Sequence, residues 1–480
     1  MLGGRVFSAT AQTASGEIGG EGPSRRLLLR AGALGGGAAL AATSAGAASA
    51  AARMPPGSAT SGGGLGPFEL FAQQDLNFQA LFALGSAGYG ASEVGEVVTT
   101  VNEINARGPS YQNFFDLFLE RAVRTAGLAD RELAAGHVIS ARGAYLRAAT
   151  YYDACLFFVL GTTARGREAD VYAAMQRNWE RATRLFDPPF EPVRIPYQGT
   201  WLPGYLLRPD RRPLRRPTVI LNNGSDAQNV DLYVYGGAAA IERGWNALIF
   251  EGPGQGSMLF EREIPYQPQW QRVVTAVVDW VAAQPGVDSQ RIGITGWSMC
   301  GESVVQAAAY EHRLAAVVAD PGVFDMWLAW PASLRKLMAS GAPKAEVNHI
   351  WNTQIIPHLT AQDRFTLAKR SELFGRGYLL SARAGRVFGD LYDLATTIMK
   401  VNCASTAPRV ASPTLVTYYQ DDAFFGQHSQ AARVLALLPA TIPKRLRYFT
   451  VAEGAEYHDA PMAPQTRNQA VFDWLGDTLR

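Results

Sequence analysis

The chain has 480 residues and a formal net charge of +2; 48% of its residues are hydrophobic and 18% are charged. This composition is that of an ordinary globular protein, and nothing in it suggests nucleic-acid binding, which usually needs a basic stripe. The length exceeds what one ordinary core fills, so we expect two domains, or one large domain with additions.

The N-terminal segment has the order of an export signal. A twin arginine, Arg25 and Arg26, precedes leucines, a weakly apolar Ala/Gly run and small residues of the A-x-A kind. This order predicts a twin-arginine signal over residues 1–52, with cleavage after Ala50 or Ala52. The run is too rich in glycine to predict a membrane span. The mature protein would be periplasmic or extracellular, whereas an Ala/Gly-rich tail in place of a signal would leave it cytoplasmic.

A flexible linker and a helical region follow. Residues 53–66, RMPPGSATSGGGLG, have the composition of a linker. Beyond them, FDLFLERAVRTAGL and GAYLRAATYYDACLFFVL place apolar residues at helical spacing. The prolines of DPP at 187–189 end this pattern, since proline stops a helix. We predict an N-terminal helical cap over residues 67–190.

Residues 191–480 alternate between short apolar strands and helical runs. After a hairpin that begins at Val193, strands are expected at 217–224, 245–256, 291–298, 314–322, 413–422 and 446–454. Continuous apolar strands separated by helices predict a mainly parallel sheet covered on both faces. The long helical stretch at 323–410 predicts a lid inserted over the sheet. The fold class is therefore α/β, with an α/β-hydrolase fold built on a sheet of the eight-stranded type.

A sharp turn follows the predicted strand RIGIT. The sequence GWSMCG, residues 296–301, resembles the G-x-S-x-G turn that exposes a nucleophilic serine between a strand and a helix. Gly296 and Ser298 fit this pattern, but Cys300 stands where a second glycine is usual. Cysteine is small, so we expect the turn to survive, with Cys300 as a buried packing residue and Ser298 as the nucleophile.

A serine nucleophile needs a histidine base and an orienting carboxylate, which follow it in the order acid, then histidine. The loop after the strand PTLVTYYQDD offers Asp421 and Asp422, and we prefer Asp422. Asp325 stays open as an acid one strand earlier. His458 lies in the loop after the last strand, where the base belongs, whereas His428 lies in a helix.

The tetrahedral intermediate also needs hydrogen-bond donors for its oxyanion. We expect the backbone N–H of Met299 and that of Gly224 or Ser225, which follow the strand PTVILNN.

No cofactor and no metal are predicted. The run EGPGQG lacks the spacing of a dinucleotide site, and the cysteines Cys155, Cys300 and Cys403 lie too far apart for a metal motif or a framework of disulfides.

Several of these stretches, in order, resemble one family. DPPFEPVRIPYQGTWLPGYLLRP, NNGSDAQ, FEGPGQG, GWSMCGE, ADPGVFD and EGAEYHDA are similar to α/β-hydrolases of the 2,6-dihydroxypseudooxynicotine hydrolase type, over about residues 140–480. That type is related to fermentation-respiration-switch-like proteins and to fungal hydrolases that shorten polyketide pigments. The resemblance implies a helical N-terminal segment over a Ser-Asp-His hydrolase core, with cleavage of esters or of carbon–carbon bonds next to carbonyls.

The sequence departs from the family pattern at three places. Cys300 replaces the second glycine, Glu251 replaces the aspartate of F-D-G-P-G-Q-G, and DAPMAP follows the histidine where relatives often have cysteine. Relatives also carry an acidic residue after the first oxyanion glycine, which is Asp226 here. It would either polarise the substrate or cap the next helix.

The sequence thus predicts a cofactor-free serine hydrolase with Ser298, Asp422 and His458 as its triad. It would attack a carbonyl of a medium-sized apolar small molecule and form an acyl-enzyme. An acyltransferase with the same triad and a non-catalytic binding protein on a hydrolase scaffold are the alternatives. Whether the protein forms a homodimer stays open.

Overall fold

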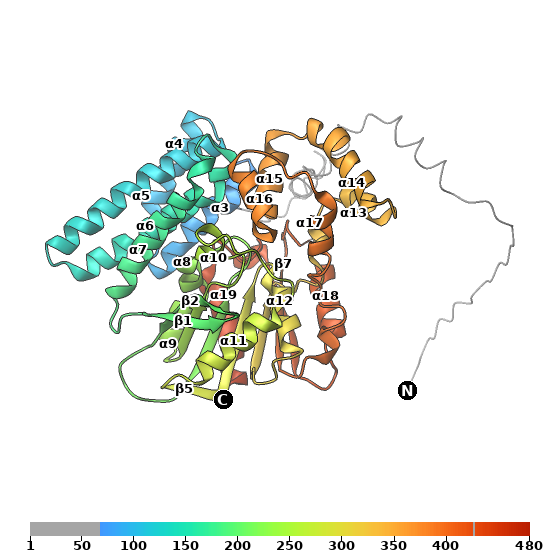
Figure 1. Ribbon diagram of the computed structural model, residues 1–480. Helices are drawn as coiled ribbons and strands as arrows, with labels where there is room; N and C mark the ends of the chain where they lie inside the picture. The colour runs from blue at the N-terminus through green and yellow to red at the C-terminus, as the bar shows by residue number, and fades with distance from the viewer. Residues whose placement is uncertain (1–67, 426–427) are drawn as a thin grey trace, which may run out of the picture.

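The computed structural model describes residues 68–425 and 428–480. The predicted signal (1–52) and linker (53–66) lie outside these residues. Within the described ranges, no helix combines the length and the apolar composition that crossing a membrane requires. The described part contains one large sheet with helices around it (Figure 1).

The sheet has eight strands in the order β1-β2-β4-β3-β5-β6-β7-β8. Strands β1 and β2 pair antiparallel, as do β2 and β4, and the remaining neighbours are parallel. The strands are β1 (Glu191–Tyr197), β2 (Thr200–Leu207), β3 (Arg216–Asn222), β4 (Asn246–Phe250), β5 (Val287–Trp297), β6 (Ala316–Asp320), β7 (Thr414–Tyr419) and β8 (Lys444–Phe449). This arrangement confirms the predicted α/β-hydrolase fold with a mainly parallel sheet.

Both faces of the sheet are buried. Every residue of β4 and β6 is buried, as the apolar runs NALIF and AVVAD require in a parallel sheet. Alternate residues face different cores: Ile220 packs with one face, and Val219 and Leu221 pack with the other. Helices α11 (Gln271–Ala282), α12 (Cys300–Ala308) and α18 (His428–Leu437) cover the first face, and α9 (Ala238–Glu242) and α19 (Pro464–Thr478) cover the second.

The register of the central strands assembles a single edge. Asn222 at the end of β3 pairs with Gly296 near the end of β5, and Trp297 pairs with Asp320 at the end of β6. Because parallel strands end at the same edge, the loops that begin at residues 223, 298 and 321 emerge side by side. This is the edge at which open α/β sheets bind ligands.

Among the described residues, five α-helices precede the sheet: α3 (Gln74–Gly85), α4 (Val94–Arg107), α5 (Tyr111–Ala134), α6 (Val138–Phe158) and α7 (Glu168–Arg184). The interior of this group holds α6, most of whose residues are buried. In Figure 1 these helices, coloured blue to green, stand together beside and above the strands.

A second group of helices lies between β6 and β7: α13 (Ala332–Ala339), α14 (Lys344–Ile350), α15 (Ala361–Ser371), α16 (Arg376–Arg383) and α17 (Leu391–Ile398). Most of this group, orange in Figure 1, lies at the same end of the molecule as the N-terminal helices. Phe365 of α15 packs its ring against Tyr111 of α5 and Phe158 of α6. The two groups are therefore in contact, although the division into cap, hydrolase domain and lid stays a prediction.

Candidate active site

Ser298 occupies the turn between β5 and α12. Its φ is +53°, a left-handed conformation that is costly for a residue with a side chain. Such strain costs about 1–3 kcal/mol and persists only where the surroundings fix it. Here the Ser298 N–H donates to the carbonyl oxygen of Asp320 over 2.7 Å.

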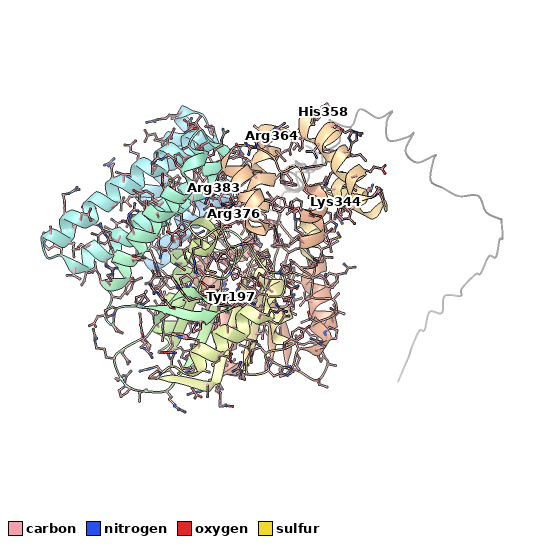
Figure 2. The ribbon with its side chains drawn as sticks, viewed as in Figure 1. Tyr197, Lys344, His358, Arg364, Arg376 and Arg383 are labelled. Atoms are coloured by element: carbon pink, nitrogen blue, oxygen red, sulfur yellow. The ribbon has the colours of Figure 1, made fainter. Side chains whose placement is uncertain are left out.

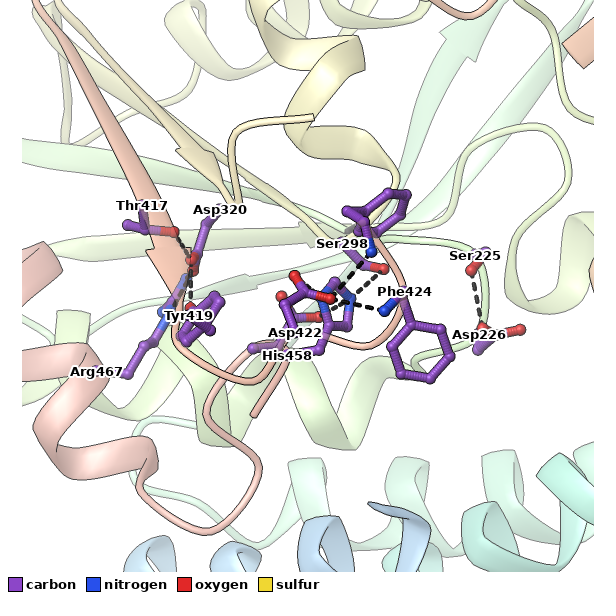
Figure 3. Close-up of polar contacts among 12 residues, drawn as sticks. Ser225, Asp226, Ser298, Asp320, Thr417, Tyr419, Asp422, Phe424, His458 and Arg467 are labelled. Carbon is purple, nitrogen blue, oxygen red and sulfur yellow. Dashed lines mark hydrogen bonds and ion pairs between the residues drawn. The ribbon is translucent and has the colours of Figure 1, made fainter. Parts of the chain in front are cut away.

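Buried polar contacts in turn hold Asp320 (Figure 3). Its carboxylate accepts hydrogen bonds from the Nε of Arg467, at 2.7 Å, and from the Thr417 and Tyr419 hydroxyls. Arg467 belongs to α19, Thr417 and Tyr419 belong to β7, and Asp320 ends β6, so three elements fix the position of the serine turn.

In this turn, Gly301 and not residue 300 is the position at which a neighbouring backbone approaches too closely for a side chain. A Cβ built on Gly301 would lie 1.9 Å from the Pro321 carbonyl oxygen, and one on Gly296 would lie 2.1 Å from that of Cys300. Cys300 itself is fully buried, and its sulfur lies 3.7 Å from the Gln255 side-chain amide, which donates to it. Burial raises the pKa of the Cys300 thiol to about 12. The turn therefore accommodates cysteine as a packed, neutral side chain.

Three predicted residues form one hydrogen-bonded chain (Figure 3). The Ser298 Oγ lies 2.9 Å from Nε2 of His458, and Nδ1 of His458 lies 2.9 Å from Oδ2 of Asp422. The Asp422 carboxylate also accepts from the backbone N–H groups of Phe424, at 2.9 Å, and Phe425, at 3.1 Å. These residues come from β5 and from the loops after β7 and β8, so the fold alone brings them together.

Charge and burial act in opposite directions on this chain. Burial alone would raise the pKa of Asp422, but the imidazole of His458 and the backbone donors outweigh it, so that pKa lies below its usual value. Burial would lower the pKa of His458, yet the carboxylates of Asp422 and Asp459 raise it to about 10. The arrangement therefore stabilises an imidazolium, the state a general base reaches after taking a proton.

The other candidate acids lie elsewhere. The Asp325 carboxylate accepts from the Trp327 N–H over 2.8 Å and begins a short helical turn. The Asp421 backbone N–H donates to the Glu456 carbonyl oxygen, and its side chain borders the cavity next to Ser298. Among the described residues, Asp422 is the only one of these three aspartates whose carboxylate forms a hydrogen bond with Nδ1 of His458.

A second carboxylate contacts the same imidazole, and sequence reasoning missed it. Oδ2 of Asp459 lies 3.1 Å from Nε2 of His458, the nitrogen that also faces Ser298. Asp459 and Ala460 both have positive φ, +62° and +51°, which folds the chain back toward the ring. Burial raises the pKa of Asp459 to about 7, although His458 acts to lower it. The only sequence signal for this contact is that Asp459 directly follows His458.

The expected oxyanion loop lies beside the serine. A Cβ on Gly224 would lie 2.7 Å from Cβ of Ser298, so a glycine is required at this approach. The Gln255 side-chain amide donates to the carbonyl oxygens of Asn223, at 2.7 Å, and Gly224, at 2.9 Å, which holds the loop in place. Gly224, Ser225 and Met299 all line the cavity above Ser298.

Asp226 also borders this cavity. Its carboxylate accepts from the Ser225 hydroxyl over 2.8 Å and lies 4.0 Å from Nζ of Lys369 in α15. The next helix, α8 (Asn229–Leu232), receives its cap from Gln228 and Asp231 instead. The helix-capping alternative for Asp226 is therefore wrong, and its carboxylate borders the cavity together with Ser225 and Lys369.

Glu251, the second departure from the family pattern, is buried beneath this loop. One oxygen of its carboxylate accepts from the Tyr172 hydroxyl and from the Asn229 side-chain amide, both at 2.9 Å, and the other accepts from the Ser257 N–H at the same distance. The longer side chain thus ties α7 and α8 to the turn after β4.

The cavity above Ser298 has a volume of about 460 Å³. That size suits a medium-sized ligand. Its walls come from the N-terminal helices, the sheet edge and the helices between β6 and β7, and most of its lining is aromatic or aliphatic. Apolar contributors are Phe78, Phe82, Phe157, Trp330, Leu334 and Phe424.

The polar lining of the cavity comes largely from helices. Asp153 of α6 and Asp231 of α8 share a hydrogen bond, and burial, followed by the charge of Asp231, raises the pKa of Asp153 well above its usual value. Lys369 of α15 pairs with Glu372 over 2.8 Å. Within residues 68–425 and 428–480, no group of His, Cys, Asp and Glu side chains is arranged to hold a metal ion.

Comparisons with known proteins agree with this geometry. The family model described as X-Pro dipeptidyl-peptidase (S15 family) matches residues 198–369. The α/β hydrolase xenA of Xenoacremonium sinensis is 31% identical over 303 residues, which cover 60% of this chain and 67% of that protein. The chain belongs to the α/β-hydrolase family.

Other α/β-hydrolase relatives extend over more of the chain. Hydrolase LUC6 of a Fusarium species is 27% identical over 425 residues, covering 86% of this chain and 98% of that protein. The 20-hydroxy-prefusarin hydrolase FUS2 of Gibberella moniliformis is 27% identical over 426 residues, again with 86% and 98% covered. Among solved structures, 2,6-dihydroxy-pseudo-oxynicotine hydrolase shares the fold with a TM-score of 0.61 and 20% identity, over 82% of this chain and 95% of that one.

Proposed function

We propose that this α/β-hydrolase is a serine hydrolase in which Ser298 is the nucleophile, His458 the general base and Asp422 the orienting acid. The observation that carries the proposal is the continuous chain from Ser298 Oγ through the imidazole to Asp422, with 2.9 Å at each step. Both distances lie within the range over which a base takes a proton from a nucleophile.

The reaction begins when Oγ of Ser298 attacks the substrate carbonyl carbon and its proton moves to Nε2 of His458. The carbonyl oxygen becomes an oxyanion, which the backbone N–H groups of Met299 and of Gly224 or Ser225 stabilise. The bond to the leaving group breaks, and that group departs with the proton from Nε2, leaving an acyl-enzyme on Ser298. Water then attacks the acyl carbon, gives a proton to Nε2, and the acid is released as Oγ recovers its proton.

The substrate we propose is a medium-sized, largely apolar molecule with an ester, a lactone or a C–C bond next to a ketone. The aromatic and aliphatic lining of the 460 Å³ cavity supports the size and polarity. A C–C substrate would release a carbanion-like group, which the imidazolium of His458 would protonate. Asp226, at the oxyanion loop, is proposed to polarise the substrate.

Turnover of a panel of p-nitrophenyl esters, lactones and β-diketones tests the proposal. Ser298→Ala should abolish hydrolysis of every member that the parent protein cleaves, because no other group replaces the nucleophile. Ser303→Ala, at a buried serine one turn along α12 whose hydroxyl lies near Tyr266 and not near His458, is the control. Equal turnover in Ser298→Ala and the parent protein would reject the mechanism, and no turnover in the parent would favour a binding protein.

We also propose export by the twin-arginine route, on the sequence of residues 1–52. Replacing both Arg25 and Arg26 by lysine should leave the precursor in the cytoplasm, because the paired arginines are what the export machinery recognises. N-terminal sequencing of exported protein should begin at residue 51 or 53. Unchanged export of the double variant would reject the signal.

A further inference from the structure

Arg370, near the end of α15, lines the cavity above Ser298. Its side chain is largely buried, and burial lowers the pKa of its guanidinium below the usual value. The contacts it makes are weak for a charged group. Nη1 lies 3.5 Å from the Ala329 carbonyl oxygen, and Cζ lies 5.4 Å from the centre of the Phe424 ring.

Two other cations of the same helical group have carboxylate partners. Lys369 pairs with Glu372 over 2.8 Å, and Arg383 of α16 pairs with Glu168 over 2.9 Å. By contrast, no carboxylate in the described ranges, 68–425 and 428–480, lies within 4 Å of Arg370, and Asp226 acts on its charge only from a longer distance. A buried charge without an ion-pair partner is unfavourable, so an anion bound in the cavity would stabilise this guanidinium.

Phe424 connects Arg370 to the reacting groups. The Phe424 ring centre lies 5.0 Å from that of the His458 imidazole on one side and 5.4 Å from the Arg370 guanidinium on the other. The distance between the imidazole and the guanidinium cannot exceed the sum of these two. A substrate bound at Ser298 can therefore reach Arg370 with a short chain.

The cavity also contains aspartates, which would favour a cationic ligand if they were free. Most of them have polar partners, whereas the Asp421 carboxylate forms no hydrogen bond or ion pair among the described residues. Asp75 accepts from the Tyr111 hydroxyl, Asp153 and Asp231 share a hydrogen bond, Asp226 interacts with Ser225 and Lys369, and Asp459 contacts His458. Of Lys369 and Arg370, the lysine and arginine side chains that line the cavity, only Arg370 has no carboxylate within 4 Å among the described residues.

We propose that Arg370 forms an anion subsite, so that the preferred substrate carries a carboxylate a short distance from the carbonyl that Ser298 attacks. The planar guanidinium suits a carboxylate because it can donate two parallel hydrogen bonds. The apolar walls hold the chain between the two ends. This inference rests on the proposed function for the position of the reacting carbonyl, but the subsite itself needs only the cavity and Arg370.

Charge-matched esters test the subsite by kinetics. The first series contains the mono-p-nitrophenyl esters of adipic, pimelic and suberic acid, each with one free carboxylate. In the second series that carboxylate is a neutral methyl ester, and in the third an ω-ammonium group replaces it at equal chain length. Every rate is corrected for spontaneous hydrolysis. The parent protein should prefer a carboxylate ester in kcat/KM. Arg370→Met should reduce the ratio of carboxylate to neutral kcat/KM about 10- to 100-fold, mainly through KM, and Arg370→Lys should restore part of it.

Arg364→Met is the matched control. Arg364 lies in the same helix, at the outer rim of the helical part and away from the strands (Figure 2), and it donates to the backbone carbonyl oxygens of Ile356 and Leu359. It does not line the cavity. Its loss removes one positive charge, so the ratio should stay as in the parent protein. A ratio that falls equally in both variants, or a preference for the ammonium esters, would overturn the subsite.

Measuring ligand binding tests the anion subsite independently of the proposed hydrolysis. Ser298→Ala, with and without Arg370→Met, is titrated with the mono-anilides of the same three diacids by calorimetry. The Arg370→Met change should weaken binding about 10- to 100-fold. If that loss is seen although the parent protein cleaves no ester, the proposed reaction fails and the subsite stands. If esters are cleaved but neither binding nor the kinetic ratio depends on Arg370, the subsite fails and the reaction stands.

Discussion

The edge of the sheet and the helices above it contribute differently to the same cavity. At the sheet edge, Ser298, Asp422 and His458 each follow a strand, and the strand order and the loops at this edge bring them together. Above them, Asp153, Lys369 and Arg370 come from helices that the chain places far apart. The first region holds groups with strict mutual geometry and is suited to chemistry. The second holds groups whose positions depend on how helices pack, and it is suited to selecting the substrate.

Replacing the acid of the sheet edge should have the largest effect. In Asp422→Asn, the amide can donate to Nδ1 of His458, which places the proton on Nε2 and prevents that nitrogen from accepting one from Ser298. We expect kcat for a neutral ester to fall by about four orders of magnitude. Asp325→Asn, at the acid position of the preceding strand, is the comparison. Equal losses in the two variants would contradict the assignment of the acid.

Crowding the serine turn should be the next largest effect. In Gly301→Ala the added Cβ would lie 1.9 Å from the Pro321 carbonyl oxygen, so the backbone has to shift. We expect a loss of about 1–3 kcal/mol in the free energy of unfolding, together with lower turnover. The control is Gly377→Ala in α16, where a Cβ meets no atom within 4 Å. Denaturant unfolding should show the control as stable as the parent protein or more stable, because alanine favours a helix.

The pH profile should separate the two carboxylates that contact His458. Asp459 is one of the charges that raise the pKa of the imidazole to about 10. His458 acts as a base only when it is neutral, so kcat/KM should rise with pH through this pKa. Asp459→Asn removes one negative charge, lowers the imidazole pKa and should move the rising limb to lower pH by about one unit or more.

The folded-state pKa of Asp459 also predicts a stability effect. It is raised from 3.8 to about 7, so the folded state holds the proton more tightly than the unfolded state. Its contribution to stability is present below pH 4 and is lost as pH rises toward 7. Asp459→Asn should therefore gain stability relative to the parent protein over this window.

Asp421→Asn is the control for the kinetic pH profile, because it removes a charge from the same cavity. A shift of its kcat/KM profile as large as that of Asp459→Asn would contradict the role given to the 3.1 Å contact between Asp459 and His458.

The smallest effect should come from the unusual residue of the turn. Cys300→Gly should retain activity within a few-fold, because the thiol is buried and neutral and the close approach falls on Gly301. Cys300→Leu should be less stable by about 1–3 kcal/mol, since the larger side chain overpacks the site. Iodoacetamide should leave the native enzyme active. Rapid alkylation of Cys300 with loss of activity would place the chemistry on the thiol.

The same division explains what the sequence could predict. Alternating strands and helices were enough for the sheet, and a turn motif following a strand was enough to find Ser298, because both signals are local. His458 and Asp422 followed from chain order, since each loop emerges at a known edge. Arg370 and Asp153 carry no such local signal: a charged residue in an amphipathic helix looks the same whether it faces solvent or a cavity. The contact of Asp459 with His458 depends on a positive-φ turn at residues that are not glycine, which the sequence does not predict.

Covalent labelling tests directly whether Ser298 is the nucleophile. The purified protein is treated with a fluorophosphonate, digested, and the modified residue is located by mass spectrometry. We expect one phosphonyl group on Ser298, with slow or no labelling in His458→Ala, because the base that activates the hydroxyl is gone. A label on another residue, or a parent protein that stays unmodified while still hydrolysing esters, would contradict it.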